Sequence, residues 1–173
     1  MSEALVIVDI QNDYFPGGEM ELVGSEEAAT VATRVKAEFN QKGLPVFVIQ
    51  HVATSPNATF FRPNTPGVEI HTSVTPADGD IVVIKHFPNS FRETTLAEKL
   101  REKSITELTI IGMMTHMCID TTVRAASDMG FIVTVVADAC ATKNLKLGQD
   151  EVSARDVQIA YLAALDGTFA QVI

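Results

Sequence analysis

Short, continuous runs of apolar and β-branched residues recur along the chain, and each is separated from the next by a longer, more polar segment. The clearest runs are residues 4–10, 44–49, 80–84, 108–111 and 131–136, with a weaker sixth candidate at 168–173. Their apolar residues are consecutive rather than alternating. This pattern predicts strands that are buried on both faces, which is typical of a parallel sheet covered by helices.

Four of the intervening segments show helical patterns. The first begins at Ser25, a predicted N-cap, repeats apolar residues every three to four positions and stops at Gly43. The second begins with Thr95 and Glu98, which are spaced as a capping box. Two more helices are expected near 118–129 and 151–165. Strands that alternate with helices predict an α/β fold: a three-layer α/β/α sandwich with a six-stranded, mainly parallel, Rossmann-like sheet, as one domain over residues 1–173.

The charge of the chain excludes several classes of partner. Its 13 Lys and Arg residues face 22 Asp and Glu residues, a formal net charge of −9. Such a surface repels phosphate groups, so neither nucleic acid nor a membrane surface is an expected partner. No apolar run approaches the ~18 residues that a membrane span needs, and no basic region of a secretory signal is present. With only two cysteines, Cys118 and Cys140, the cytoplasm is the predicted location.

The stretch from residue 51 to residue 80 differs from the rest of the chain. It holds four of the seven prolines and is rich in Thr, Asn and Gly, with an aromatic pair at Phe60 and Phe61. A loop this long inside a compact domain is usually functional. We therefore expect this stretch to form a lid or a wall of a pocket.

Three chemically competent side chains come at the ends of predicted strands. Asp9 lies near the end of the first run, Lys85 directly follows the third, and Cys118 comes a few residues after the fourth. Each alone has an ordinary structural explanation: a loop-fixing acid, a snorkelling lysine or a small buried cysteine. Together they are more specific, because the carboxyl ends of parallel strands form the ligand crevice. A helix start and an ammonium are expected to lower the pKa of the thiol, and a carboxylate can accept its proton.

Three motifs in this order resemble those of the isochorismatase-like cysteine hydrolases, a superfamily that includes nicotinamidases. They are VDIQNDYFPGG at 8–18, KH at 85–86 leading to NSF at 89–91, and GMMTHMC at 112–118. The resemblance implies a catalytic triad of Asp9 as base and acid, Lys85 as support for the thiolate, and Cys118 as nucleophile.

The same resemblance implies further features of the site. It places a non-proline cis peptide at 113–114 and an oxyanion hole made by the backbone N–H groups of Met114 and Cys118. It also implies substrate contacts from Tyr14, from Phe61 (or its neighbour Phe60) and from Thr115.

The sequence departs from the nicotinamidase pattern at the metal site. Those enzymes carry an Asp-x-His pair after the second strand, where this chain reads Gln50-His51-Val52-Ala53. The four histidines have no recognisable ligand spacing. We therefore expect no metal and no cofactor, and we interpret His51 as a pocket or packing residue.

These observations favour a hydrolase that cleaves a small-molecule amide or a related C–N bond through an acyl-enzyme on Cys118. Two alternatives stay open. One is a vinyl ether hydrolase of the isochorismatase type that uses Asp9 as an acid, and the other is a non-catalytic binding domain with the same fold. A small molecule is the expected partner of the site. A homo-oligomer, a dimer or larger, is also expected, with residues 54–76 reaching a neighbouring subunit.

Overall fold

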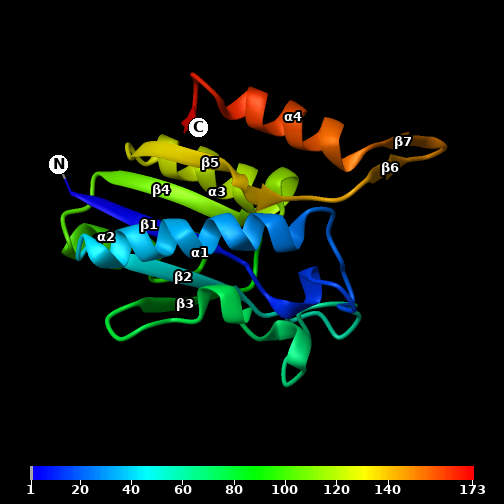
Figure 1. Cartoon of the computed structure of the whole chain (residues 1–173), viewed down its shortest axis with the longest axis horizontal. Coiled ribbons are helices and arrows are strands. Elements are labelled where there is room, and N and C mark those ends of the chain that lie inside the picture. The colour runs from blue at the N-terminus through cyan, green and yellow to red at the C-terminus, as the bar shows by residue number, and fades with distance from the viewer. Residues whose placement is uncertain (1) are drawn as a thin grey trace.

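The computed structural model describes residues 2–173, and its central feature is a six-stranded parallel sheet in the order β3-β2-β1-β4-β5-β8 (Figure 1). The strands are β1 (Glu3–Val8), β2 (Val46–His51), β3 (Ile81–Lys85), β4 (Glu107–Met113), β5 (Ile132–Ala141) and β8 (Gln171–Val172). The order reverses between β1 and β4. This reversal opens the crevice in which open α/β sheets bind their ligands.

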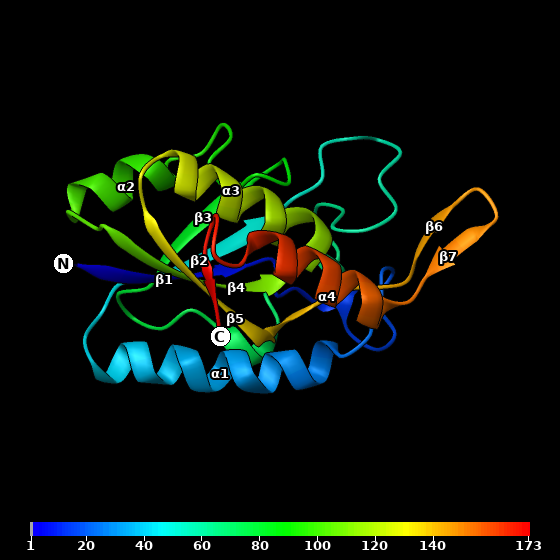
Figure 2. The same cartoon turned by 90° about the horizontal axis from the view of Figure 1, so that it is seen from above.

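Helices cover both faces of the sheet, which confirms the three-layer α/β/α prediction (Figure 2). Helix α1 (Ser25–Gln41) lies alone on one face, where Ala32 and Phe39 pack against Leu5 and Val48. The other face is covered by α2 (Leu96–Glu102), α3 (Asp120–Asp128) and α4 (Ala154–Leu165). None of the helices within residues 2–173 is long and apolar enough to cross a membrane.

The burial expected for all strands is wrong for β3. Its side chains alternate between buried and exposed, and Val82 and Ile84 are 43% and 53% exposed. Their register partners on β2 include Val48, so both side chains lie on the face covered by α1. Because β3 is an edge strand and the segment before it is a loop rather than a helix, α1 does not extend over them.

Local details of the helix boundaries also differ from the predictions. The N-cap of α1 is Gly24, with Ser25 as the first helical residue, and the side chain of Thr95 makes no capping hydrogen bond to α2. The helix predicted from 151 begins only at Ala154. The residues before it form a hairpin of β6 (Leu145–Leu147) and β7 (Asp150–Val152), which extends away from the sheet in Figure 2.

Residues 52–80 form a long connection with two short 3-10 turns, Pro66–Val68 and Thr72–Val74. The side chain of Gln11 holds this connection near the end of β1. Its Nε2 donates to the carbonyls of Val68 (2.7 Å) and His51 (2.9 Å), and its Oε1 accepts from the N–H of His51 (2.7 Å). The loop is thereby fixed beside the carboxyl ends of the central strands.

Candidate active site

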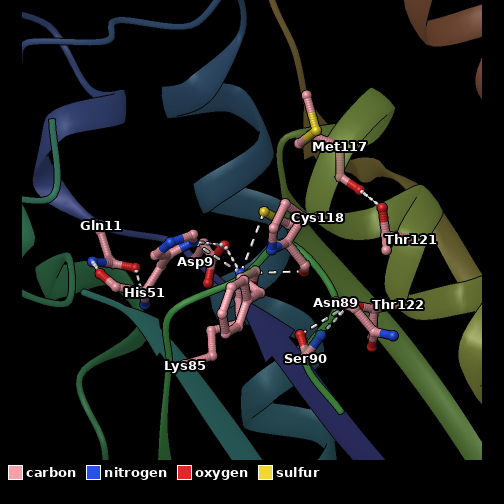
Figure 3. A network of polar contacts seen from close by, with 12 residues as sticks. Asp9, Gln11, His51, Lys85, Asn89, Ser90, Met117, Cys118, Thr121 and Thr122 are labelled. Carbon is pink, nitrogen blue, oxygen red and sulfur yellow. Dashed lines mark hydrogen bonds and ion pairs between the residues drawn. The ribbon is translucent and has the colours of Figure 1, made fainter. Parts of the chain in front are cut away.

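The carboxyl ends of β1, β3 and β4 bring Asp9, Lys85 and Cys118 into direct contact (Figure 3). Nζ of Lys85 lies 2.7 Å from Oδ2 of Asp9 and 3.3 Å from Sγ of Cys118. Asp9 and Lys85 are completely buried, and Cys118 is 2% exposed. Residues separated by more than one hundred positions therefore form one cluster of a carboxylate, an ammonium and a sulfur.

Asp9 is held in an unusual environment for a buried carboxylate. Its backbone has a φ of +52°, a region that non-glycine residues seldom adopt, and its N–H donates to the carbonyl of Ile49. Within residues 2–173, neither carboxylate oxygen accepts a hydrogen bond of good geometry. The ion pair with Lys85 is the principal contact of Asp9. The carboxylate thus retains unused capacity to accept a proton.

Lys85 has more acceptors than protons to give them. In addition to Asp9 and Cys118, its ammonium contacts Nδ1 of His51 (3.1 Å) and the carbonyls of Phe87 (3.0 Å) and Pro88 (3.3 Å). Three N–H groups cannot serve five acceptors at full strength at once. The Lys85 ammonium is therefore shared among more acceptors than it can fully satisfy.

The protonation state of the cluster follows from the balance of burial and charge. Burial acts to raise the pKa of Asp9, but the pKa of this carboxyl is lowered, and the positive charge of the Lys85 ammonium is the largest cause of the lowering. Burial acts to lower the pKa of Lys85, but Asp9 and Cys118 outweigh it, so the pKa of this ammonium is raised. At neutral pH the pair is therefore Asp9 carboxylate and Lys85 ammonium.

The expectation that the pocket lowers the pKa of Cys118 is wrong for this resting state. Burial and then the negative charge of Asp9 raise the pKa of the thiol far above its usual value, and Lys85 offsets only part of this. Cys118 also lies in a π-helical turn, Thr115–Ile119, before the first residue of α3. At rest the sulfur is consequently a protonated thiol beside a carboxylate.

The chain around Cys118 has the cis peptide expected at Met113–Met114. After it, the carbonyl of Met114 accepts from the N–H groups of Met117 (3.0 Å) and Ile119 (3.2 Å). Just before it, Gly112 has a φ of +131°, and a Cβ there would lie 2.0 Å from the carbonyl oxygen of Val8. Glycine therefore allows β4 to approach β1 closely at the base of the site.

Two of the three predicted substrate contacts lie together beside the triad. The rings of Tyr14 and Phe61 are 4.6 Å apart, and the ring of Phe61 is 5.7 Å from that of His51. Burial raises the pKa of Tyr14, and the nearby Cys118 and Asp9 side chains raise it further, so its hydroxyl stays protonated. Phe60 packs against both Tyr14 and Phe61, which extends the aromatic wall.

The geometry does not support the third predicted contact, Thr115. Its hydroxyl is 2.6 Å from Oε1 of Gln158 on α4 and 3.2 Å from the carbonyl of Ala141 on β5. Nε2 of Gln158 also donates to two carbonyls of β5. Thr115 therefore ties the π-helical turn to helix α4 and to the end of β5, and its hydroxyl is already engaged there.

His51 is the contact of the triad that the sequence did not single out for chemistry. Its Nδ1 lies 3.1 Å from Nζ of Lys85 and 3.7 Å from Oδ2 of Asp9. Its position is explained by register, because His51 pairs directly with Lys85 across β2 and β3. Only the strand order, which brings β3 next to β2, makes this pairing visible.

The donor atoms of Asp9, His51 and Cys118 lie within 4.8 Å of one another, close enough to suggest a metal site. Each of the three atoms is, however, already in contact with the Lys85 ammonium. A metal ion held by all three would lie against a fixed positive charge. The donor set therefore suits proton transfer better than metal binding.

A surface cavity of about 380 Å³ is lined by residues that include Asp13, Gly17 and Arg62, and Asp9, Lys85 and Cys118 are not among its lining residues. Its buried carboxylate is already engaged, since Asp13 accepts hydrogen bonds from the N–H groups of Glu19 and Phe61. The reactive groups lie instead in the closed cluster around Cys118.

Comparisons with known proteins identify the family of the chain. The family model described as "Isochorismatase domain" matches residues 3–165. The chain is 49% identical over 172 residues to the uncharacterized isochorismatase family protein YddQ of Bacillus subtilis, covering 99% of this chain and 96% of that protein. A putative isochorismatase hydrolase from Oleispira antarctica has a similar crystal structure, with a TM-score of 0.94, 44% identity and coverage of 99% and 92%. Nicotinamidase 3 of Arabidopsis thaliana is 28% identical, covering 94% of this chain and 85% of that protein.

Proposed function

We propose, from the premise that this chain belongs to the isochorismatase family of hydrolases, that it is a cysteine hydrolase of small-molecule amides or related C–N bonds. The observation that carries the proposal is the contact of one ammonium with both a carboxylate and a thiol, all buried at the strand ends. An amidase needs these three functions in reach of one carbonyl: a nucleophile, a base that becomes an acid, and a positive charge.

In the acylation step, the thiol proton of Cys118 passes to the Asp9 carboxylate while Sγ attacks the carbonyl carbon of the substrate. The Lys85 ammonium stabilises the sulfur as it becomes anionic. The backbone N–H groups of Met114 and Cys118 are proposed to donate to the oxyanion of the tetrahedral intermediate. The C–N bond then breaks, and the leaving nitrogen takes the proton from Asp9 and departs as ammonia or an amine.

In the deacylation step, Asp9, again a carboxylate, accepts a proton from a water molecule that attacks the thioester. The C–S bond breaks, Asp9 returns its proton to the sulfur, and the product leaves as a carboxylic acid that ionises in solvent. The cycle ends in the resting state described above, a carboxylate, an ammonium and a thiol. The raised pKa of Cys118 is compatible with this cycle, because proton transfer to Asp9 accompanies attack.

The test is an ammonia-release screen over carboxamides, ureido acids and hydroxamates with the wild-type enzyme, Cys118→Ala and Cys140→Ala. Cys140 is the matched control, because it is the other buried cysteine and its pKa is likewise raised, to about 12. We expect Cys118→Ala to lose about 10³-fold or more of the activity and Cys140→Ala to keep it. Mass spectrometry of quenched wild-type enzyme is expected to show the acyl group on Cys118, and an active Cys118→Ala enzyme would remove the nucleophile from the proposal.

The vinyl ether alternative makes a different demand on Asp9. That reaction needs a carboxylic acid to protonate the substrate, whereas the pKa of Asp9 is lowered beside Lys85. Cys118→Ala separates the alternatives as well, since an acid mechanism at Asp9 does not use the sulfur. A purely binding role predicts that Cys118 takes up no acyl group from any substrate.

A further inference from the structure

The mechanism proposed above makes no use of His51, although this side chain touches two of the three catalytic groups. Its Nδ1 lies 3.1 Å from Nζ of Lys85 and 3.7 Å from Oδ2 of Asp9, and one of its ring nitrogens lies within 4.8 Å of Sγ of Cys118. An acyl group bound to that sulfur would therefore be a direct neighbour of the imidazole.

The backbone of His51 is fixed more firmly than packing alone requires. Gln11, which is completely buried, donates to the carbonyl of His51 and accepts from its N–H, at 2.9 Å and 2.7 Å. The next residue, Val52, donates its N–H to the carbonyl of Lys85 (3.0 Å). These bonds fix the position of the His51 backbone, and the contact of Nδ1 with Lys85 holds the imidazole in the cluster.

The neighbours of His51 also determine its tautomer. An ammonium carries only donors, so the contact with Lys85 requires a lone pair on Nδ1. The proton of the neutral ring is then on Nε2. Within residues 2–173, Nε2 makes no hydrogen bond. It is nevertheless not a buried atom without a partner, because the side chain of His51 is 16% exposed. The free N–H thus lies on the accessible side of a ring whose centroid is 5.7 Å from that of Phe61.

We propose that His51 is a substrate-binding residue of the active site, whose Nε2–H donates a hydrogen bond to an acceptor that the substrate carries beside its scissile carbonyl. This inference rests on the proposed acyl-enzyme and names the class of substrate for it: amides with an adjacent carbonyl or carboxylate oxygen, rather than simple alkyl amides. Because Nδ1 is occupied by the contact with Lys85, Nε2 is the ring nitrogen left to donate to a group bound at Cys118.

Three variants of His51 distinguish the role of Nε2 as a donor from the role of Nδ1 as an acceptor. His51→Gln places an amide N–H near the position of Nε2 and leaves no acceptor for Lys85. His51→Asn places an acceptor near the position of Nδ1 and has no donor at Nε2. His51→Leu has neither. Thermal unfolding of each variant shows whether it is folded before binding is compared.

The probes are two aldehydes of the same length that add to the Cys118 thiol as hemithioacetals, methylglyoxal and propanal. They differ in one group, a carbonyl oxygen next to the aldehyde in methylglyoxal and a methylene in propanal. The apparent Kd of each is measured from its protection of Cys118 against alkylation by iodoacetamide. The intrinsic reactivity of each aldehyde is the same for all variants, so the change in the ratio of the two Kd values isolates the contribution of His51.

We expect the preference for methylglyoxal over propanal to fall about fivefold to tenfold in His51→Leu and His51→Asn and to be kept in His51→Gln. A preference kept in His51→Asn and lost in His51→Gln would overturn the inference, because His51 would then act only through Lys85. An unchanged ratio in all variants would overturn it as well. Absence of any adduct on wild-type Cys118 would overturn the proposed function together with this inference, whereas adducts with a His51-independent ratio overturn this inference alone.

Discussion

Strand β3 has a buried ion pair at each end, and the two pairs have the same length. Before its first residue, Asp80 accepts from Nζ of Lys36 on α1 at 2.7 Å, and at its last residue, Lys85 contacts Asp9 at 2.7 Å. At both ends, the paired side chains are less than a tenth exposed. Distance and burial therefore do not distinguish them.

The two ion pairs differ in the further hydrogen bonds that their side chains make. Asp80 also accepts from the N–H of Ala77 (2.8 Å), and Lys36 also donates to the carbonyl of Thr75 (2.9 Å), so the first pair joins a loop to a helix. Among residues 2–173, Asp9 has no such hydrogen bond, and the acceptors around Lys85 include the sulfur of Cys118. A satisfied pair stabilises the fold, whereas an incompletely satisfied pair is available for proton transfer, at a cost in stability that the rest of the fold offsets.

The largest expected difference between the two pairs is in activity. Replacing Asp9 by Asn removes the group that takes the thiol proton, and we expect kcat/KM for the amide substrate to fall by about 10²–10⁴-fold. Asp80→Asn is the matched control, since it changes the same chemical group at the other end of β3, and its kcat/KM should stay within a few fold. Equal losses of kcat/KM in the two variants would show that both substitutions lower activity by disturbing the fold, which would contradict the distinction between the two ion pairs.

The second expected difference is in stability. Lys85→Met leaves Asp9 as a buried charge with no hydrogen bond, and we expect a loss of about 3–5 kcal/mol in the free energy of unfolding at pH 7. Lys36→Met should cost less, about 1–3 kcal/mol, because Asp80 keeps its bond from Ala77. Urea denaturation of the two variants measures both values.

The pH dependence of the same variants gives an independent check. In the wild-type protein the lowered pKa of Asp9 contributes stability above its unfolded-state pKa, and this is lost as the pH falls through the folded value. Without Lys85, burial dominates and raises that pKa, so the sign reverses and Lys85→Met should regain stability as the pH falls from 7 to about 5. A loss that does not change with pH would show that Asp9 is not the cause.

The position of the triad could be predicted because it depends on a rule that holds for every parallel sheet. Asp9, Lys85 and Cys118 each follow a strong apolar run, and the carboxyl ends of such strands meet in space. The burial of β3 could not be predicted in this way. A single run of four apolar residues, 81–84, does not say whether its strand lies at the centre or at the edge of the sheet.

Side-chain roles that depend on register or local turn geometry were also beyond the sequence. The contact of His51 with Lys85 requires β2 and β3 to be neighbours with those two residues opposite each other. The hydroxyl of Thr115 contacts Gln158 from within a π-helical turn. The sequence contains no pattern that predicts such a turn. The raised pKa of Cys118 could not be predicted for a related reason. It depends on how deeply Asp9 and Cys118 are buried together.

The smallest expected effect is the response of the wild-type enzyme to pH, and it tests whether the pair acts as a unit. The pKa of Asp9 is lowered while those of Lys85 and Cys118 are raised, so no group of the triad changes charge between about pH 5 and pH 9. We expect kcat/KM for the amide substrate to vary less than about twofold over this range, because it reports the groups of the free enzyme. An independently ionising thiol would instead give a limb that rises toward its ordinary pKa of about 8.5. A tenfold rise of kcat/KM per pH unit between pH 7 and pH 8 would therefore show that the sulfur loses its proton to solvent before substrate binds, and Asp9 would no longer be needed as its base.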